Sequence, residues 1–228
     1  MTELISLIHS GDKARWVWPH WYRHYSKWWT GWDKIDTVLL TETKDAHFDH
    51  VINVKSGRGK WGEELIRVMK GMDCTYVLYQ HEDYFLTGET DINFLLSITK
   101  LMKSENIPLI KCCGPGAGLW RGEEEPWRVG VLQKTDLKVE GMEVLEYPHH
   151  VDYLLSHQIS IWNKDFIIST VKPEYSPWEH EIKGTREVRQ REVKIYAIIG
   201  KTPMPYEATV RRGKIKRGYK KFFKKPKV

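Results

Sequence analysis

Short apolar blocks alternate with helically spaced apolar residues along the first half of the chain. Continuous apolar runs predict strands at residues 4–10, 36–40, 50–54, 75–80 and 107–113. Apolar residues recur at helical spacing in residues 60–72 and again in residues 90–106, where Thr90 is the expected N-cap. Strands separated by single helices predict a mostly parallel, doubly wound sheet.

The second half of the chain has a less regular pattern. The pattern predicts a Gly- and Pro-rich loop at 114–127, strand-like pieces at 128–133 and 142–147, a helix at 162–171 and a strand at 192–199. No internal repeat and no long linker divides the sequence. We therefore expect an α/β fold with one domain over residues 1–210. Its sheet should be mixed but mostly parallel, with an elaborated C-terminal half, and a basic tail should follow over residues 211–228.

The composition is typical of a soluble globular protein. The 228 residues are 41% hydrophobic and 29% charged, which argues against global disorder. No apolar run approaches the ~20 residues that span a bilayer, and the N-terminus lacks the features of a secretory signal. The three cysteines have neither zinc-ligand spacing nor a disulfide framework. A reducing, cytoplasmic setting is expected.

The charge is distributed unevenly along the chain. The formal net charge is +6, with 36 Lys and Arg against 30 Asp and Glu. Ten of these cations and no acid lie between Arg211 and Val228. Removing the ten leaves 26 cations against 30 acids, so residues 1–210 carry a net charge of −4. A compact basic run attracts polyanions such as nucleic acid, anionic lipid or a phosphorylated substrate.

The strand expected at residues 75–80 stops on His81, Glu82 and Asp83. Two adjacent carboxylates at the mouth of a buried strand cost stability unless something cationic compensates them. Ligands of open parallel sheets bind beyond the carboxyl ends of the strands, which is where these residues are expected. The alternative is that Glu82 and Asp83 only solvate the strand end and cap the next turn.

Three stretches resemble, in this order, a group of GT-A-type glycosyltransferases found in bacteria and phages. They are "YVLYQHEDYFL", "HQISIWNKDFIISTVKPEYSPWEHE" and "AIIGKTPMPYEATVRRGKIKRGY". The shared elements are a strand ending in acids, a Gln-x-x-x-Trp segment (Gln158 and Trp162) and a Ser-Pro-Trp-x-x-Glu element (residues 176–181). The resemblance covers most of the chain. It implies a GT-A-like fold and transfer of a sugar from a nucleotide sugar to a hydroxyl group, in the host cytoplasm if a phage encodes the chain.

The resemblance also implies a divalent cation and the residues that bind the donor. GT-A enzymes usually hold Mn²⁺ or Mg²⁺ through an Asp-x-Asp motif, and the ion stabilises the departing diphosphate. The aligned triplet is His81-Glu82-Asp83, so Asp83 matches the metal-binding acid, with His81 in place of the first carboxylate and Glu82 at the ribose or behind the metal. Arg212-Gly213-Lys214 matches a late Arg-Gly-Lys element, which assigns Arg212 and Lys214 to the diphosphate. A single carboxylate assisted by tail cations remains the metal-free alternative.

Transfer with inversion needs a base that takes the proton of the acceptor hydroxyl. The resemblance assigns this role to Glu181, with Glu179 as the second candidate. Trp178 is available to stack on a sugar or a base, and Gln158 and Trp162 are expected on the acceptor side. The alternative that Glu181 only caps a helix remains open.

Weaker candidates lie at the first expected strand and in a late cluster of histidines. Ser10, Gly11 and Asp12 follow the strand where GT-A enzymes receive the nucleotide base, although a plain turn explains them equally well. His149, His150 and His157 are candidates for the late histidine that such enzymes often recruit to the metal. Ordinary polar contacts are the alternative for each histidine.

Six tryptophans fall between residues 16 and 32. A helix beginning at Pro19 would put Trp21, Trp28 and Trp32 on one face, with Trp18 as a staple. A core face is the plain interpretation, and a stacking platform for sugars or unpaired bases is the functional one. His20 and His24 have i, i+4 spacing but no third ligand, so they predict no zinc site.

Two other functions compete with the transferase. Glu192-Val193-Lys194 has a Glu-x-Lys spacing found in one nuclease superfamily, with Asp165 upstream, and a metal-dependent nuclease would suit a basic tail. A non-catalytic binding module with a glycosyltransferase-like fold would explain the histidine at position 81.

The basic tail at residues 211–228 indicates which kind of molecule accepts the sugar. Some phages glycosylate hydroxymethylated pyrimidines in their own DNA, and a transferase acting on duplex DNA must expose the base. Membrane attachment through Phe222, Phe223 and the surrounding lysines is a second interpretation, and a frayed terminus is a third. We favour modified DNA as the acceptor over a cell-surface or lipid-linked glycan.

Overall fold

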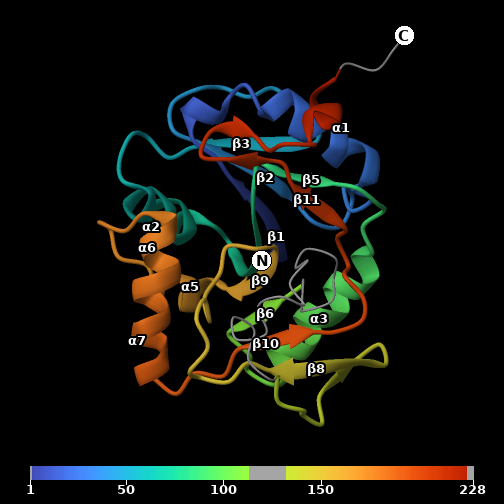
Figure 1. Cartoon of the computed structure of the whole chain (residues 1–228), viewed down its shortest axis with the longest axis vertical. Helices are drawn as coiled ribbons and strands as arrows, with labels where there is room; N and C mark the ends of the chain where they lie inside the picture. The colour runs from blue at the N-terminus through green and yellow to red at the C-terminus, as the bar shows by residue number, and fades with distance from the viewer. Residues whose placement is uncertain (1, 113–131, 225–228) are drawn as a thin grey trace.

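A nine-stranded mixed sheet forms the centre of the protein (Figure 1) in this computed structural model, which describes residues 2–112 and 132–224. In spatial order its strands are β3 (Val51–Lys55), β2 (Thr37–Thr41), β1 (Thr2–His9), β4 (Cys74–His81), β9 (Ser160–Asn163), β6 (Leu109–Lys111), β10 (Tyr196–Ile198), β8 (Met142–Glu146) and β7 (Lys138–Val139). Strands β3, β2, β1 and β4 are parallel, as are β6 and β10, whereas β9 lies antiparallel between β4 and β6. The expected α/β architecture with a mostly parallel, mixed sheet is confirmed.

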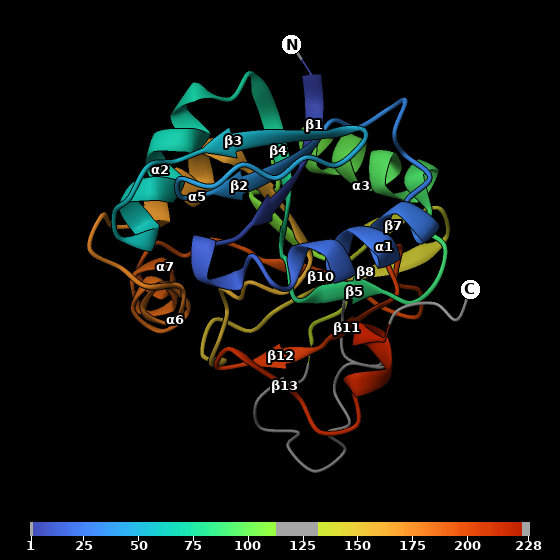
Figure 2. The same cartoon turned by 90° about the horizontal axis from the view of Figure 1, so that it is seen from above.

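Helices cover both faces of the sheet. The main ones are α1 (Trp18–Trp28), α2 (Trp61–Gly71), α3 (Ile92–Ser104), α5 (Lys164–Thr170) and α7 (Thr185–Gln190), with a single turn α6 (Pro177–Glu179). Figures 1 and 2 show α1 and α3 on one side and α2, α5 and α7 on the other. Three further turns are the 3-10 helices η1 (Asp12–Ala14) and η3 (Lys220–Phe223) and the π-helix η2 (His180–Gly184).

Alternation along the central strands builds two hydrophobic cores. In β4, Tyr76 and Leu78 pack with α1 and α3, whereas Val77 and Tyr79 pack with α2 and α5. Because both faces are buried, the strand reads as a continuous apolar run rather than as an alternating one. This explains why the strand was visible in the sequence and why its polar end stands out.

Two short antiparallel pairs extend the fold beside the carboxyl end of β4. Strand β5 (Tyr84–Leu86) pairs with β11 (Tyr206–Ala208), and β12 (Val210–Arg211) pairs with β13 (Lys214–Ile215). The sequence analysis predicted none of these strands. The β12–β13 hairpin crosses the predicted boundary at residue 210, so the first basic residues belong to the folded body.

The structure corrects several predicted element ends. Asp91, not Thr90, caps α3, because the Asp91 carboxylate accepts the Phe94 N–H at 3.0 Å. The helix expected at 162–171 begins only at Lys164, and Trp162 belongs to strand β9. The whole loop 114–127 and residues 128–131 of the strand-like piece 128–133 lie outside the described residues. No described helix is both long enough and apolar enough to cross a membrane.

Candidate functional site

The carboxyl ends of the parallel neighbours β1 and β4 lie side by side, at the point where the order in which strands are added to the sheet changes direction. From β1 the chain continues to β2 on one side, and from β3 it crosses over to β4 on the other, so a topological switch point lies between β1 and β4. The last residues of these strands, His9 and His81, are register partners. In open α/β sheets, the crevice beyond such a point is the usual ligand site.

Two neighbouring cavities open at this switch point and share His81 and Glu82. The first, here called the α2 cavity, has a volume of about 250 Å³ and is lined by His9, Ser10, Gly11, Glu42, Gly59, Trp61, Glu64 and Pro177 besides the shared pair. The second, the hairpin cavity, has about 290 Å³ and is lined by Lys13, Ala14, Trp16, Val17, Asp83, Val210, Arg212 and Gly213 besides the shared pair. The predicted donor residues Ser10, Gly11, Glu82, Asp83 and Arg212 thus gather around two adjoining cavities.

The acid pair lies between the cavities with its charge poorly compensated. Burial, together with the neighbouring Asp83 charge, raises the pKa of Glu82 to about 8. Burial raises the pKa of Asp83 to about 6, although Lys216 lowers it in part. Neither acid forms an ion pair within the described residues. A bound cation or a hydrogen-bonding ligand would relieve this cost.

His81 belongs to a cluster of four buried or half-buried histidines. Its ring stacks on His9 with 6.3 Å between ring centroids and lies 5.7 Å from the ring of His157. His157 Nε2 lies 3.1 Å from His180 Nδ1, and His180 Nε2 lies 3.0 Å from the Thr170 hydroxyl. Burial lowers the pKa of His81 to about 4 and that of His180 to about 3, so both rings are neutral at pH 7.

A metal at this point would need ligands beyond the side chains that the structure describes. Among residues 2–112 and 132–224, no three His, Cys, Asp or Glu side chains gather to hold an ion. Mg²⁺ sites commonly take only one or two carboxylates, with substrate phosphates and water completing the shell. Asp83 and Glu82 fit that pattern, whereas the His81 ring is engaged by its neighbours. The metal ligands Asp83 and His81 stay a prediction.

Asp12 and Lys214 differ from the other predicted donor residues. The Asp12 carboxylate accepts hydrogen bonds from the backbone N–H groups of Thr43 and Lys44, at 3.1 Å each, and it is not part of either cavity lining. Asp12 therefore fastens the loop after β2. Lys214 lies exposed on β13, whereas Arg212, in the turn at φ +51°, lines the hairpin cavity with Asp83.

Glu181 lies in the π-helix η2 and is held by the backbone. Its Oε1 accepts the N–H of His157 at 2.8 Å. Burial raises the pKa of Glu181, and the His157 hydrogen bond and the Lys111 charge offset part of that rise. A raised pKa suits a general base, and π-helical turns are frequent at functional sites. Glu181 lines neither cavity among the described residues, so its catalytic role stays a prediction.

Glu179, rather than Glu181, is the acid that caps the helix, a role that was open for Glu181 as the alternative to its role as base. The Ser176 side chain accepts the Glu179 N–H at 3.2 Å, and Glu179 Oε2 accepts the Ser176 N–H at 2.9 Å, which completes a capping box. Lys183, followed by Ser176, lowers the pKa of Glu179 to about 2. These contacts are the opposite of what a general base requires.

The three predicted acceptor residues differ widely in exposure. Trp178 is 64% exposed and follows Pro177 of the α2 cavity, so its ring is available to a ligand. Trp162 has no exposed surface and packs beside His157 and Phe166, so its predicted acceptor role is wrong. Gln158 is half-buried, and nothing in its surroundings tests its role.

The tryptophans near the N-terminus are mostly core residues. Trp18 and Trp21 are buried on α1, where Tyr25 and Trp29 complete the buried face, whereas Trp28 and Trp32 are only partly buried. Trp16 is the exception, because it is 40% exposed and lines the hairpin cavity. The remaining histidines have other surroundings: His20 and His24 contact phenylalanine rings of the C-terminal segment, and His149 and His150 lie in a turn away from both cavities.

Sequence reasoning missed several residues of the α2 cavity. In the sequence, the position of Glu64 in the first turn of a helix is explained by the helix dipole alone. In the structure, Glu64 is only 4% exposed and its Oε1 has no hydrogen-bond partner among the described residues. Burial, and then the Glu42 charge, raises the pKa of Glu64. Trp61 stacks on His9 with 5.7 Å between ring centroids. No local sequence signal identifies the cavity lining, because His9 comes from β1, Glu42 follows β2, and Trp61 and Glu64 come from α2.

The predicted nuclease motif does not form a site. Lys194 makes an ion pair with Glu146 at 3.2 Å. Glu192 has φ +52°, outside any strand, and Asp165 lies in the first turn of α5. The motif therefore lacks the strand that would align its side chains.

Another cavity, of about 640 Å³, lies at the N-terminus of α3. Its charged lining residues are Lys34, Glu89, Asp91 and Lys201. Asp91 and Lys201 form an ion pair, Asp91 also caps the helix, and Lys34 donates to the Asn93 side chain at 3.4 Å. Because three of these four groups have partners within the protein, the functional site is better assigned to the switch point.

Comparison with known proteins supports the fold. No protein-family profile and no curated protein matches the sequence. The structure of residues 1–349 of S. aureus TarS in complex with UDP-GlcNAc is similar, with a TM-score of 0.56 and 13% identity over 93% of this chain and 60% of that one. A longer TarS structure gives a TM-score of 0.54 and 11% identity over 90% of this chain and 36% of the other.

This chain spans between about a third and three fifths of the length of those TarS chains. At such low identity the likeness concerns the fold alone. It confirms the GT-A-like architecture that the sequence resemblance implied.

Proposed function

We propose that this protein is a glycosyltransferase that takes its sugar from a nucleotide-sugar donor. The observation that carries the proposal is the uncompensated acid pair Glu82–Asp83 at the switch point, between two cavities and opposite the cationic β12–β13 hairpin. A diphosphate with a bound cation matches both groups, because the cation compensates the acids and the diphosphate pairs with the cations of the hairpin. The fold likeness to TarS, whose structure was determined with UDP-GlcNAc, supports the same donor class.

In this proposal the nucleoside occupies the α2 cavity and the diphosphate lies at the acid pair. Trp61 and His9 offer stacked rings at the α2 cavity. Asp83 and Glu82 would hold Mn²⁺ or Mg²⁺, which would supply positive charge to stabilise the leaving diphosphate. Arg212 faces the same space from the hairpin and adds positive charge there.

Transfer also requires that the acceptor hydroxyl loses its proton to a base. Glu181 is our candidate, because burial raises its pKa toward the range in which a carboxylate accepts protons effectively. Trp178, exposed beside the α2 cavity, contributes a stacking surface. We propose a hydroxymethylpyrimidine of DNA as the acceptor, with a cell-surface or lipid-linked glycan as the competing acceptor.

The donor assignment is tested without knowing the acceptor. Purified protein is incubated with a panel of nucleotide sugars and Mn²⁺ or Mg²⁺, and release of the free nucleotide is followed, because transferases commonly leak sugar to water. We expect one donor class to be hydrolysed and to raise the melting temperature. Asp83→Asn should lose the hydrolysis, whereas the exposed control Glu174→Gln should keep it.

Failure to bind or to hydrolyse any donor would overturn the proposal. Binding without turnover, unchanged by Asp83→Asn, would instead favour a non-catalytic binding module with this fold.

A further inference from the structure

Two segments far apart in the sequence share an unusual charge pattern. Residues 13–32 contain four Lys or Arg and no acid, and residues 211–224 contain eight Lys or Arg and no acid. The exposed cations of these segments are Lys13, Arg15, Lys27, Arg211, Arg212, Lys214, Arg217, Lys220, Lys221 and Lys224. Only the second segment is conspicuous in the sequence, because tryptophans dominate the first.

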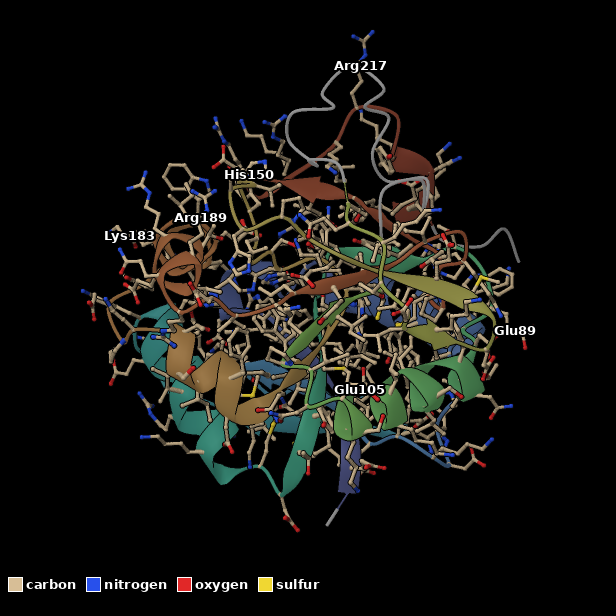
Figure 3. All side chains as sticks on the ribbon, turned by 90° about the horizontal axis from the view of Figure 1, so that it is seen from below. Glu89, Glu105, His150, Lys183, Arg189 and Arg217 are labelled. Atoms are coloured by element: carbon tan, nitrogen blue, oxygen red, sulfur yellow. The ribbon has the colours of Figure 1, made fainter. Side chains whose placement is uncertain are left out.

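The fold brings the two segments together. Arg23 on α1 donates to the backbone carbonyl oxygens of Phe222 and, at 2.6 Å, of Lys224. The Phe223 ring lies 5.7 Å from Trp16 and 5.0 Å from His20. Figures 1 and 2 show the C-terminal turn η3 beside α1, and Figure 3 shows Arg217 extending away from the body. The two segments thus form a single surface, here called the basic surface.

The exposed cations of the basic surface form no ion pair with an acid among residues 2–112 and 132–224. The ion pairs among the described residues use cations from residues 55–201 only. Within the surface, Lys27 lies over the Trp28 ring and Lys221 over the Phe222 ring, and these contacts leave their charge uncompensated. So many unpaired cations on one face repel each other and are stabilised by an external polyanion.

We propose that the basic surface binds the phosphodiester backbone of DNA, with residues 13–32 contributing alongside the C-terminal segment. A membrane fits less well, because Phe222 and Phe223, the residues suited to insertion, are half-buried against α1 and Phe85. The 11 residues of α1 extend over about 16 Å, which corresponds to on the order of five phosphates along one strand.

The basic surface also adjoins the hairpin cavity. Lys13, Trp16 and Arg212 belong to both, and the cavity contains the acid pair. We infer that DNA held on this surface presents an extruded base at Trp16, which offers an exposed ring for stacking. This placement rests on the proposed transferase function, whereas the DNA-binding surface does not.

The test measures binding of the full chain to a short fluorescein-labelled DNA duplex by anisotropy, without any nucleotide sugar. With five phosphate contacts, affinity should fall about 500-fold between about 50 and about 200 mM salt. The variants are Lys13→Gln with Arg15→Gln for the first segment, and Lys220→Gln with Lys221→Gln for the second. Each pair should lower the magnitude of the salt slope by about two, which leaves about a 40-fold fall over the same range.

The matched control is Lys70→Gln with Lys100→Gln, which removes two exposed cations from α2 and α3 and should bind as the parent protein does. Parent-like binding by the Lys13/Arg15 variant would overturn the composite surface. Binding to phosphatidylserine vesicles but not to DNA would overturn the choice of partner. Donor hydrolysis, assayed separately, reports on the transferase proposal, so DNA binding without hydrolysis would leave the surface standing and reject the enzyme.

Discussion

Replacing Glu82 by glutamine should stabilise the metal-free protein at alkaline pH. Burial, with the adjacent Asp83 charge, raises the pKa of Glu82 from 4.5 to about 8. The folded protein therefore holds this proton more tightly than the unfolded chain does. Stability falls as the pH rises above 4.5, and the loss is complete above about 8. Glu82→Gln keeps the shape of the protonated acid and removes the titration.

The size of the effect follows from the pKa values. At about 1.4 kcal/mol for each pH unit, moving a pKa from 4.5 to about 8 corresponds to an upper limit of about 5 kcal/mol. Glu82 is not fully buried and titrates together with Asp83, so solvent screening and coupling reduce this limit, and we expect about 2 kcal/mol. For a chain of this length, that difference corresponds to about 4–8 °C in melting temperature.

The assay is thermal unfolding in EDTA across pH 5 to 9 of the parent protein, Glu82→Gln and the exposed control Glu174→Gln. At pH 5 the parent and Glu82→Gln should melt together, and at pH 8.5 the variant should melt about 4–8 °C higher. A constant difference between the two proteins at all pH values would refute the reasoning, since Glu82 would then not be desolvated. Adding Mn²⁺ and the donor should recover stability at pH 8.5 in the parent more than in the variant.

Four single variants test individual assignments. Asp83→Asn should lower nucleotide release from the donor by about 10²–10³-fold while the protein stays folded, and normal release would remove Asp83 from the site. Ser176→Ala removes the acceptor of the Glu179 N–H and should lower the free energy of unfolding by about 1 kcal/mol in a denaturant titration, and an unchanged midpoint would show that the capping box contributes nothing. Trp162→Ala should destabilise the buried core by about 3–5 kcal/mol. Trp178→Ala, at an exposed position, should change stability by less than about 0.5 kcal/mol but weaken acceptor use, and equal effects on stability would contradict this contrast.

The sequence predicted the parallel half of the fold because the central strands β1, β2 and β4 are largely buried on both faces. The runs near β1, β2 and β4 are continuous and apolar, and Leu65, Val68 and Met69 on α2 face the same core. Local periodicity is sufficient there, since each element pairs with its neighbours in the simple order β3-β2-β1-β4. The position of Glu82 and Asp83 at the carboxyl end of β4 followed from the same pattern.

In the second half of the chain, pairing between strands far apart in the sequence determines the fold, so local patterns predicted it poorly. Strand β9 enters antiparallel between β4 and β6, so Trp162 became a core residue although its flanking motif suggested an accessible one. Glu179, and not Glu181 as the alternative interpretation had it, caps the helix, because the helix begins at Pro177 and then widens into the π-helix η2. Neither the burial of Trp162 nor the capping role of Glu179 can be predicted from a stretch of about ten residues alone.

The C-terminal segment illustrates a different limit. In the sequence it is a run of lysines and arginines with two phenylalanines, for which solvation, a membrane and DNA are all reasonable partners. The phenylalanine rings find their partners on and just before α1, about 200 residues earlier in the chain, in contacts such as those of Phe223 with Trp16 and His20. Once the rings are packed, the charges stay exposed, and we propose that these cations, which form no ion pair among the described residues, bind a polyanion.

Buried polar groups without partners gather at the switch point between β1 and β4. The acid pair Glu82–Asp83 lacks an ion-pair partner, and the buried Glu64 oxygen lacks a hydrogen bond, within the described residues. Both line the α2 or hairpin cavity, and both cost folding free energy. Natural sequences tend to keep such costs where a ligand removes them. We therefore propose that a cationic ligand arriving with the substrate compensates the acids that end β4, because the nearby cations among the described residues, Lys13, Arg212 and Lys216, form no ion pair with them.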